Sequence, residues 1–266
     1  MRISGEEQSR REAFEIALWA EGRPELSIEE LAKLGLGADD GQDQEKGVGN
    51  TYGGDDSGMP GLGPLAPFGS WQSVAATIMR KTADSARFDQ LSTVFDLYRW
   101  IVFGNQFTTM PFLVDVTGDS RSVSISSLSL APAISAVTEL VGGLVTPDTL
   151  TGIVNSIKKI GQLAVENKGL REKNSNVHQG VLTGVNGDLR LGRLQTTVQM
   201  EYKTGKGYQQ LNQRLTVSRF FGRLDYGLCL RNSEILLAWD RQDVHDWAKG
   251  TSSSPYPPNT SPAWGN

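Results

Sequence analysis

The chain has 266 residues, of which 38% are hydrophobic and 21% charged, with a formal net charge of −4 at pH 7. This composition excludes a fully disordered protein, because disorder requires fewer apolar residues and a larger net charge. A single cysteine excludes an internal disulfide framework, and no stretch of 18 residues is apolar enough to span a bilayer as a helix. The first residues also lack the apolar centre of a signal peptide, so we expect a protein made in a reducing compartment.

We expect residues 1–36 to form an acidic helical arm. Apolar side chains at helical spacing predict a helix over 6–20, and Ser27 with Glu30 has the pattern of a capping box that starts a second, shorter helix. Residues 37–69 are rich in Gly, Pro and Asp, and this composition predicts a flexible linker. A globular α+β domain is expected over 70–250.

The first half of this domain is predicted to be mainly helical. Ser70 begins a pattern of two consecutive helices that end by Gly104, and period-two alternation over 112–125 then predicts a β-hairpin that turns at Gly118 and Asp119. Pro132 and the pair Thr146-Pro147 each begin a further apolar helix. Together these two helices predict a helical hairpin over 132–168.

The second half is predicted to be a sheet. Alternation is clearest over 194–203, and further alternating segments at 211–221, 224–230 and 235–239 complete an antiparallel meander with one buried face. Residues 251–266 are rich in Ser and Pro and are expected to form a disordered tail. The predicted fold is therefore α+β, with the C-terminal meander covered by helices and with an acidic helical arm before it.

Charge is segregated along the chain. Residues 1–56 carry a balance of −8, whereas 157–231 hold 13 basic and 5 acidic side chains. Such segregation predicts an anionic partner for the basic section or an acidic arm that covers it, although an ordinary solvated surface would give a similar count. The candidate membrane- or anion-binding residues are Lys158, Lys159, Lys168, Arg214, Arg219 and Arg223.

The sequence contains no catalytic or metal-binding motif, so we predict a non-enzymatic protein without a metal or cofactor. Only His178, in a predicted loop, and His245, beside Asp243 and Asp246, could act as a base. There is no G-x-S-x-G turn and no phosphate-binding glycine loop, and two histidines with one cysteine are too few for a zinc site.

Cys229 lies between two leucines in a predicted strand, where a small buried residue is the ordinary interpretation. A second interpretation is a lipidation site or reactive thiol. It follows from Cys229 being the only cysteine and from Arg223 and Arg231, whose nearby positive charges would favour the thiolate.

The function predicted from these patterns is that of a membrane-associating, self-assembling structural protein, similar to a viral matrix layer. Its basic face on the C-terminal sheet and helix 147–168 would bind an anionic membrane surface or a ribonucleoprotein, and its flexible arms would contact further copies of the protein. Such a protein would act on the cytoplasmic side of a membrane or inside a virion. Two alternatives remain: a cytolysin-like virulence protein whose helical hairpin 132–168 moves to allow membrane insertion, and a small hydrolase centred on His245.

Overall fold

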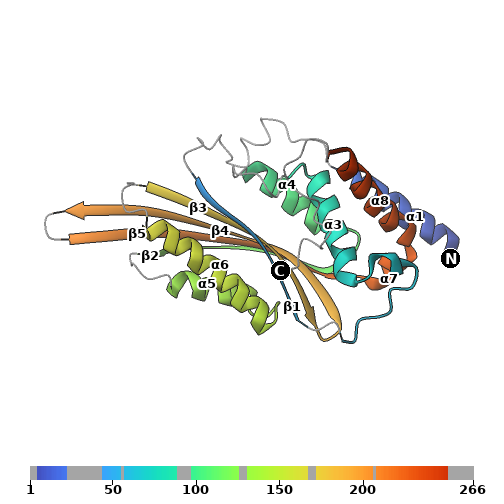
Figure 1. Cartoon of the computed structure of the whole chain (residues 1–266), viewed down its shortest axis with the longest axis horizontal. Coiled ribbons are helices and arrows are strands. Elements are labelled where there is room, and N and C mark those ends of the chain that lie inside the picture. The colour runs from blue at the N-terminus through green and yellow to red at the C-terminus, as the bar shows by residue number, and fades with distance from the viewer. Residues whose placement is uncertain are drawn as a thin grey trace.

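The computed structural model describes residues 5–22, 44–54, 57–88, 97–125, 131–166, 172–205 and 208–250. These residues form an elongated molecule in which a long twisted sheet carries helices on its faces and at one end (Figure 1). The α+β class predicted from the sequence is therefore confirmed.

The sheet has five strands in the order β1-β3-β4-β5-β2. β1 runs parallel to β3, and the other neighbouring strands are antiparallel. The meander β3-β4-β5 forms its centre, so β1 and β2 occupy the two edges. The strands are β1 (Gln44–Gly54), β2 (Leu113–Ile125), β3 (Glu172–Val185), β4 (Asp188–Gly205) and β5 (Tyr208–Leu224).

The main hydrophobic core lies at one end of the sheet. Leu182, Leu189, Leu191 and Leu224 of the sheet pack there against α1, α3, α4, α7 and α8 and the short 3-10 helix η1. Phe220 of β5 adds a ring that lies 5.3 Å from that of Trp100. The elements around this core are α1 (Gly5–Ala20), η1 (Gly63–Phe68), α3 (Trp71–Ser85), α4 (Leu97–Thr108), α7 (Tyr226–Arg231) and α8 (Ser233–Gly250).

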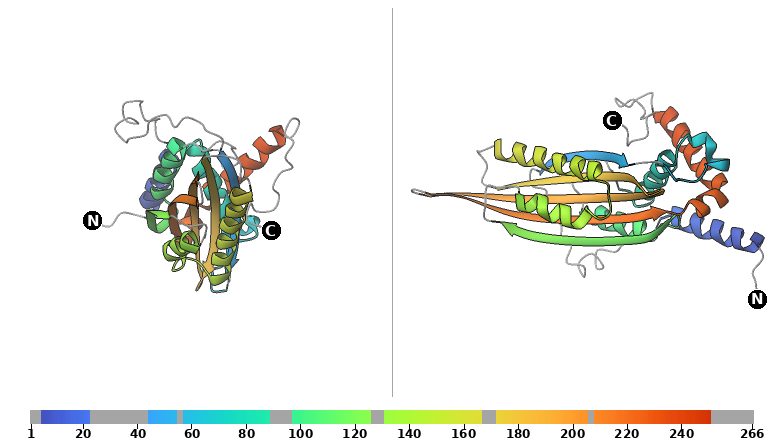
Figure 2. Two further views of the ribbon diagram at one scale, coloured as in Figure 1. Left: turned by 90° about the vertical axis from the view of Figure 1, so that its left-hand side faces the viewer. Right: turned by 90° about the horizontal axis from the view of Figure 1, so that it is seen from below.

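A helical hairpin covers the opposite face of the sheet. It consists of α5 (Ala131–Val141) and α6 (Pro147–Glu166), as the sequence predicted for this segment. The view from below in Figure 2 shows both helices lying along the sheet, away from the helices gathered at its other end. None of the helices in the described part of the chain combines the length and apolar character that a membrane crossing requires.

The N-terminal helix and the start of α3 match the sequence predictions. α1 covers the predicted 6–20 segment, and the Ser70 hydroxyl caps α3 by accepting a hydrogen bond from the Ser73 N–H at 3.2 Å. The predicted linker 37–69 is wrong in part, because it contains β1 and η1. β1 gains its hydrogen-bond partners from β3, more than 100 residues later, and local composition carries no signal of such a partner. The predicted capping box at Ser27 lies outside the described residues.

The prediction for 112–125 was also wrong, because this segment is one strand rather than a hairpin. The expected turn at Gly118 and Asp119 lies inside β2, where these residues face Phe220 and Arg219 of β5. The irregularity in its pairing with β5 is a register shift between Val114 and Thr117, before the expected turn. The predicted end of the helix before β2 was also wrong, because α4 extends beyond Gly104 to Thr108.

The predicted strands at 224–230 and 235–239 are helices α7 and α8. Asp225 explains the first difference, because its carboxylate accepts a hydrogen bond from the Leu228 N–H at 2.9 Å and caps α7. β3 was not predicted, and His178, which was expected in a loop, lies in this strand. The predicted tail 251–266 lies outside the described residues.

Candidate membrane-contacting site: the α5–α6 hairpin

The hairpin α5–α6 closes an apolar cluster of its own on the sheet. The sheet contributes Val181 of β3, Leu194 of β4 and Phe221 of β5, all at most 2% exposed. This cluster is separate from the main core on the other face of the same strands. The hairpin contributes the buried residues Ala136, Val137, Leu140, Val141, Val145 and Ile153.

The strand register explains why three neighbouring strands offer one apolar surface here. Gly192 of β4 lies directly between Val181 of β3 and Phe221 of β5. A Cβ atom at Gly192 would lie 2.5 Å from Cδ1 of Phe221 and 2.7 Å from the carbonyl oxygen of Phe220. The glycine therefore leaves the space in which the Phe221 ring lies across β4.

Arg190 of β4 fastens the turn of the hairpin. Its Nη1 donates to the carbonyl oxygens of Gly143 and Leu144, each at 3.3 Å. Both carbonyls belong to the turn that follows α5, outside the helix. A single arginine thus ties the turn between α5 and α6 to the central strand.

A group of three threonines forms the second fastening. Thr149 at the start of α6 and Thr183 of β3 are fully buried, and their hydroxyl oxygens lie 3.3 Å apart. The Thr146 N–H donates to the Thr183 hydroxyl at 3.3 Å, and the Thr146 and Thr149 hydroxyls are 2.9 Å apart. The turn end of the hairpin is thus held to the sheet by hydrogen bonds as well as by apolar contact.

Two of the predicted anion-binding residues, Arg219 and Arg223, lie on β5 and pair with acidic side chains. Arg223 donates to Oδ2 of Asp115 from Nη2 at 2.8 Å and from Nε at 3.0 Å, and its Nη1 lies 3.4 Å from Asp188. The bonds to Asp115 raise the pKa of Arg223. Arg219 lies 3.8 Å from Asp119. The charge of this part of the sheet is therefore largely balanced within the molecule.

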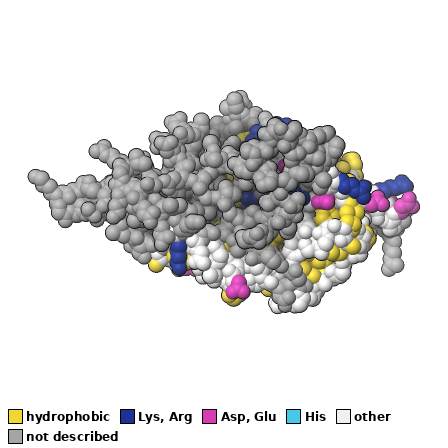
Figure 3. Space-filling view, in the orientation of Figure 1, with side chains coloured by type: hydrophobic (Ala, Val, Ile, Leu, Met, Phe, Trp, Pro, Cys, Tyr) yellow, Lys and Arg dark blue, Asp and Glu magenta, His cyan; other side chains and the backbone are white. Residues whose placement is uncertain are grey.

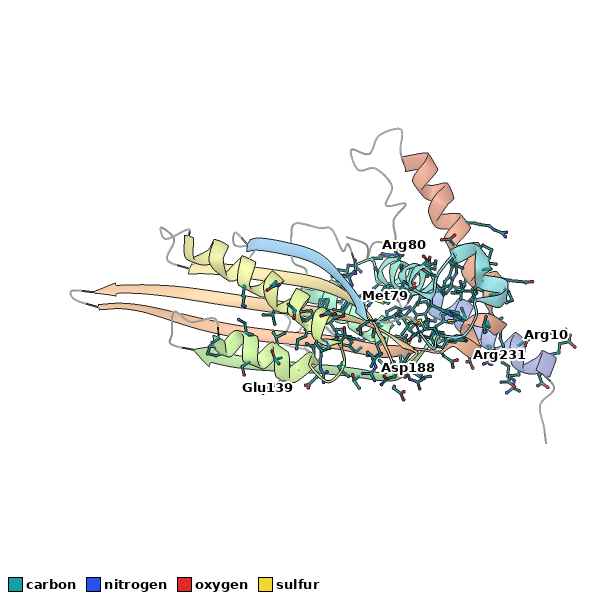
Figure 4. All side chains as sticks on the ribbon, turned by 60° about the horizontal axis from the view of Figure 1, so that its bottom comes forward. Arg10, Met79, Arg80, Glu139, Asp188 and Arg231 are labelled. Carbon is teal, nitrogen blue, oxygen red and sulfur yellow. The ribbon has the colours of Figure 1, made fainter. Side chains whose placement is uncertain are left out.

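The remaining predicted anion-binding residues are only partly placed. Lys158 is exposed on α6, while the side chains of Lys159 and Arg214 and the whole of Lys168 lie outside the described part. Figure 3 shows basic and acidic side chains next to each other at the α1 end of the molecule. In Figure 4, Asp188 lies near the junction between the hairpin and the helices of the main core. The predicted basic face stays a prediction for the undescribed side chains.

Cys229 lies on α7, not on a strand, and is fully buried. Burial raises the pKa of its thiol, and the charge of Asp225 acts in the same direction. The two arginines expected to favour the thiolate bind carboxylates instead: Arg223 binds Asp115, and Arg231 binds Glu12. The folded structure therefore opposes a thiolate at Cys229, and lipidation of this residue stays a prediction.

Arg193 is a buried cation that the sequence analysis counted but did not single out. It lies on β4 facing the main core, and its guanidinium lies 5.5 Å from the ring centroid of Phe103 and 5.8 Å from that of Phe88. Burial lowers the pKa of Arg193 to about 10. Alternation along the strand was the available signal, since Arg193 shares the face of the buried leucines Leu189 and Leu191.

The two histidines considered as bases are placed by their backbone alone. His178 lies in β3 and His245 in α8, but the side chains of both lie outside the described part. No group of three His, Cys, Asp or Glu side chains suited to a metal ion was found among the described residues. The hydrolase alternative centred on His245 stays a prediction.

No protein-family model and no curated protein matches this sequence. Among solved structures, the chain is similar to the Evf virulence factor, with 12% sequence identity and a TM-score of 0.38. The similarity covers 74% of this chain and 76% of that one.

Proposed function

We propose that this protein is a non-enzymatic, membrane-associating protein whose α5–α6 hairpin is the membrane-contacting element. The observation that carries the proposal is the separate apolar cluster between the hairpin and the sheet. A layer with its own cluster can leave the sheet without opening the main core. The same arrangement agrees with the cytolysin-like alternative, in which this hairpin moves.

The energetics set the condition for opening. Burying a Val, Leu, Ile or Phe side chain contributes about 1.5 to 3 kcal/mol, so the closed hairpin is strongly favoured in water. Opening exposes Val181, Leu194 and Phe221 together with the apolar side of α5 and α6. A lipid phase offsets this loss because its acyl chains replace the apolar contacts. Opening is therefore coupled to the membrane surface.

The hydrogen bonds of Arg190 and the threonine group hold the hairpin at its turn, so opening requires these bonds to break. Gly142 and Gly143 lie in this turn between α5 and α6. If the turn end separates first, Arg190 loses its two carbonyl partners and becomes a free cation beside the exposed apolar face. An apolar surface bordered by a cation suits a bilayer with anionic headgroups.

A reversible disulfide lock tests this proposal. The double variant Thr149→Cys/Thr183→Cys replaces two hydroxyl groups 3.3 Å apart on the hairpin and the sheet. We expect the oxidised form to bind vesicles of phosphatidylcholine and phosphatidylserine at least about tenfold more weakly in flotation, and the reduced form to recover wild-type binding. Buried Cys229 does not compete for the new thiols.

The matched control is Thr146→Cys/Thr149→Cys, whose two residues both belong to the turn and start of α6. A disulfide there leaves the hairpin free to move, so oxidation should not change binding. Equal vesicle binding by the oxidised and reduced forms of the Thr149→Cys/Thr183→Cys variant would contradict the hairpin as the contacting element.

Dye release from the same vesicles separates the two modes of membrane association. A matrix-like layer binds without leakage, whereas a cytolysin-like protein releases dye once the hairpin opens.

Exposed Lys158 provides the test of the anionic preference, because Lys158→Glu should weaken binding to anionic vesicles and leave binding to neutral ones unchanged. His245→Ala tests the hydrolase alternative, which predicts loss of a measured hydrolytic activity.

A further inference from the structure

We propose that β2 pairs antiparallel with β2 of a second copy of this chain, across a two-fold axis at Ser120. The pairing would join two five-stranded sheets into one continuous sheet. This inference stands apart from the proposed function, because it rests on the edge strand and not on the hairpin.

β2 is an edge strand whose regular part is open to such pairing. Its neighbour in the sheet is β5, and residues 117–125 follow β5 without a register shift. An antiparallel edge strand directs alternate N–H and C=O groups away from the sheet. Within the described part of the chain, no turn, loop or helix end makes a backbone hydrogen bond to residues 117–125.

The other end of β2 is distorted, which confines the pairing to this regular part. Asp115 has a positive φ of 53° and lies in the register shift between Val114 and Thr117. Arg223 holds Asp115 there through two hydrogen bonds. Bulges and charged groups of this kind protect strand edges from pairing. Residues 117–125 contain no proline and no bulge.

The charges of β2 select one register. A two-fold axis perpendicular to the sheet keeps each face of the sheet on its own side. Two residues that oppose each other across the axis therefore have residue numbers that differ by an even number. An axis at Ser120 places Asp119 opposite Arg121 of the second copy, twice in the dimer. An axis at Asp119 would oppose two carboxylates, and an axis at Arg121 would oppose two guanidinium groups.

The opposite edge of the sheet lacks this self-complementarity. β1 carries Glu45 and Lys46 as adjacent residues near its first end, and glycines occupy Gly47, Gly49, Gly53 and Gly54. Glu45 and Lys46 are neighbours in the sequence, so their side chains lie on opposite faces of the sheet. They therefore cannot oppose each other across such an axis. The second copy is therefore assigned to β2.

A cysteine at the axis tests the pairing. In Ser120→Cys the two new thiols would face each other, because directly opposed residues of antiparallel strands have Cβ atoms about 4.5 to 5.5 Å apart. Mild oxidation should give a covalent dimer in non-reducing electrophoresis. The control is Ser135→Cys, on the exposed side of α5, and Cys229 is buried in both variants. Equal dimer formation by the two variants would overturn the register.

Charge exchange provides the second test. Arg121→Asp opposes two carboxylates at both symmetry-related positions, so we expect the dimer dissociation constant in sedimentation analysis to rise at least about tenfold. The double variant Asp119→Arg/Arg121→Asp restores opposite charges and should bring the constant back to within about threefold of wild type. Thermal melting checks each variant's fold, because Asp119 also lies near Arg219. A wild-type protein that stays monomeric, or a folded double variant without recovery, overturns the proposal.

Discussion

Glu12 ties the N-terminal helix to a segment more than 200 residues later. Its carboxylate accepts hydrogen bonds from Nε and Nη2 of Arg231, both at 3.2 Å, and from the Asn232 side chain at 3.3 Å. The bond from Arg231 is the main cause that lowers the pKa of Glu12. α1 is thereby fixed against α7 and the start of α8 beside its buried residues Ile16 and Trp19.

We predict that Glu12→Gln lowers the free energy of unfolding at pH 7 by about 0.5 to 1 kcal/mol, because Arg231 is about half exposed and such ion pairs contribute little more. The melting temperature should fall by about 1 to 3 °C in calorimetry. The control Glu15→Gln makes the same charge change at an exposed position of the same helix and should have almost no effect.

The pH dependence of this difference follows from the lowered pKa of Glu12. A carboxyl group with a lower pKa in the folded state stabilises the fold above its unfolded pKa and loses this effect as the pH falls through its folded pKa. The gap between wild type and Glu12→Gln should therefore be complete at pH 7 and should narrow from about pH 4.5 downward. A gap that stays constant down to pH 2 would contradict the ionised pair.

The cap at Asp225 illustrates why single residues could not be assigned their roles from the sequence. The alternating apolar residues after Leu224 are compatible with a strand, and the capping role of Asp225 becomes decisive only because α7 can pack on η1 and α8. The pairing of Arg219 and Arg223 with carboxylates was equally hidden. Their partners Asp115 and Asp119 are about 100 residues earlier in the chain, in a segment whose predicted turn would have separated them from β5.

At the scale of elements, β4 depends on glycine for its packing against the hairpin. Gly192 faces the Phe221 ring, whereas Gly143 in the hairpin turn has no atom within 4 Å of the place where a Cβ would lie. These two glycines therefore form a matched pair. Gly192 is required because the Phe221 ring lies too close for a Cβ atom, whereas a Cβ atom at Gly143 would meet no neighbour.

We predict that Gly192→Ala lowers the free energy of unfolding by about 1 to 3 kcal/mol, because Phe221 must move from its place under the hairpin. Gly143→Ala should be neutral or should stabilise by about 0.4 to 1 kcal/mol, since alanine restricts the unfolded chain. Urea denaturation of both variants measures this difference. Equal effects in the two variants would show that the ring does not need the space at Gly192.

The elements that the sequence predicted well are those whose signals are local. Ser70, Pro132 and Thr146-Pro147 mark helix starts through capping and proline geometry, and α3, α5 and α6 begin there. β1 was missed because its parallel partner β3 lies more than 100 residues later in the chain. β3 had a local signal that the prediction did not use, the Asn186-Gly187 turn to β4, in which both residues have a positive φ. The helical hairpin could thus be predicted, but its fastening to the sheet by Arg190 and Thr183 could not, since both residues depend on the strand register.

The whole molecule has two apolar clusters that share one sheet. The main core joins α1, α3, α4, α7 and α8 to one face, and the hairpin cluster lies on the other. Two clusters on a common sheet need not open together, because the smaller layer can separate while the larger one stays packed.

We predict that native-state hydrogen exchange is faster in α5 and α6 than in α3. Ile153→Ala should speed exchange in residues 131–166 by about thirtyfold or more, because removing a buried isoleucine side chain costs about 2 to 5 kcal/mol. Exchange in α3 should change much less. Ile78→Ala, in the main core, should speed exchange in both regions. If Ile153→Ala speeds exchange equally in α3, the two clusters open as one unit.

The packing of α1 against α7 and α8 also has a consequence for synthesis on the ribosome. Trp19 lies 6.0 Å from Trp239, and its indole N–H donates to the Gln106 carbonyl at 2.9 Å. At about 5 to 20 residues per second, about 10 to 40 seconds pass between the synthesis of α1 and that of Trp239. During that interval α1 can pack on α3 and α4 but lacks its contact with Trp239, so nascent chains of this protein should recruit a chaperone until α8 emerges.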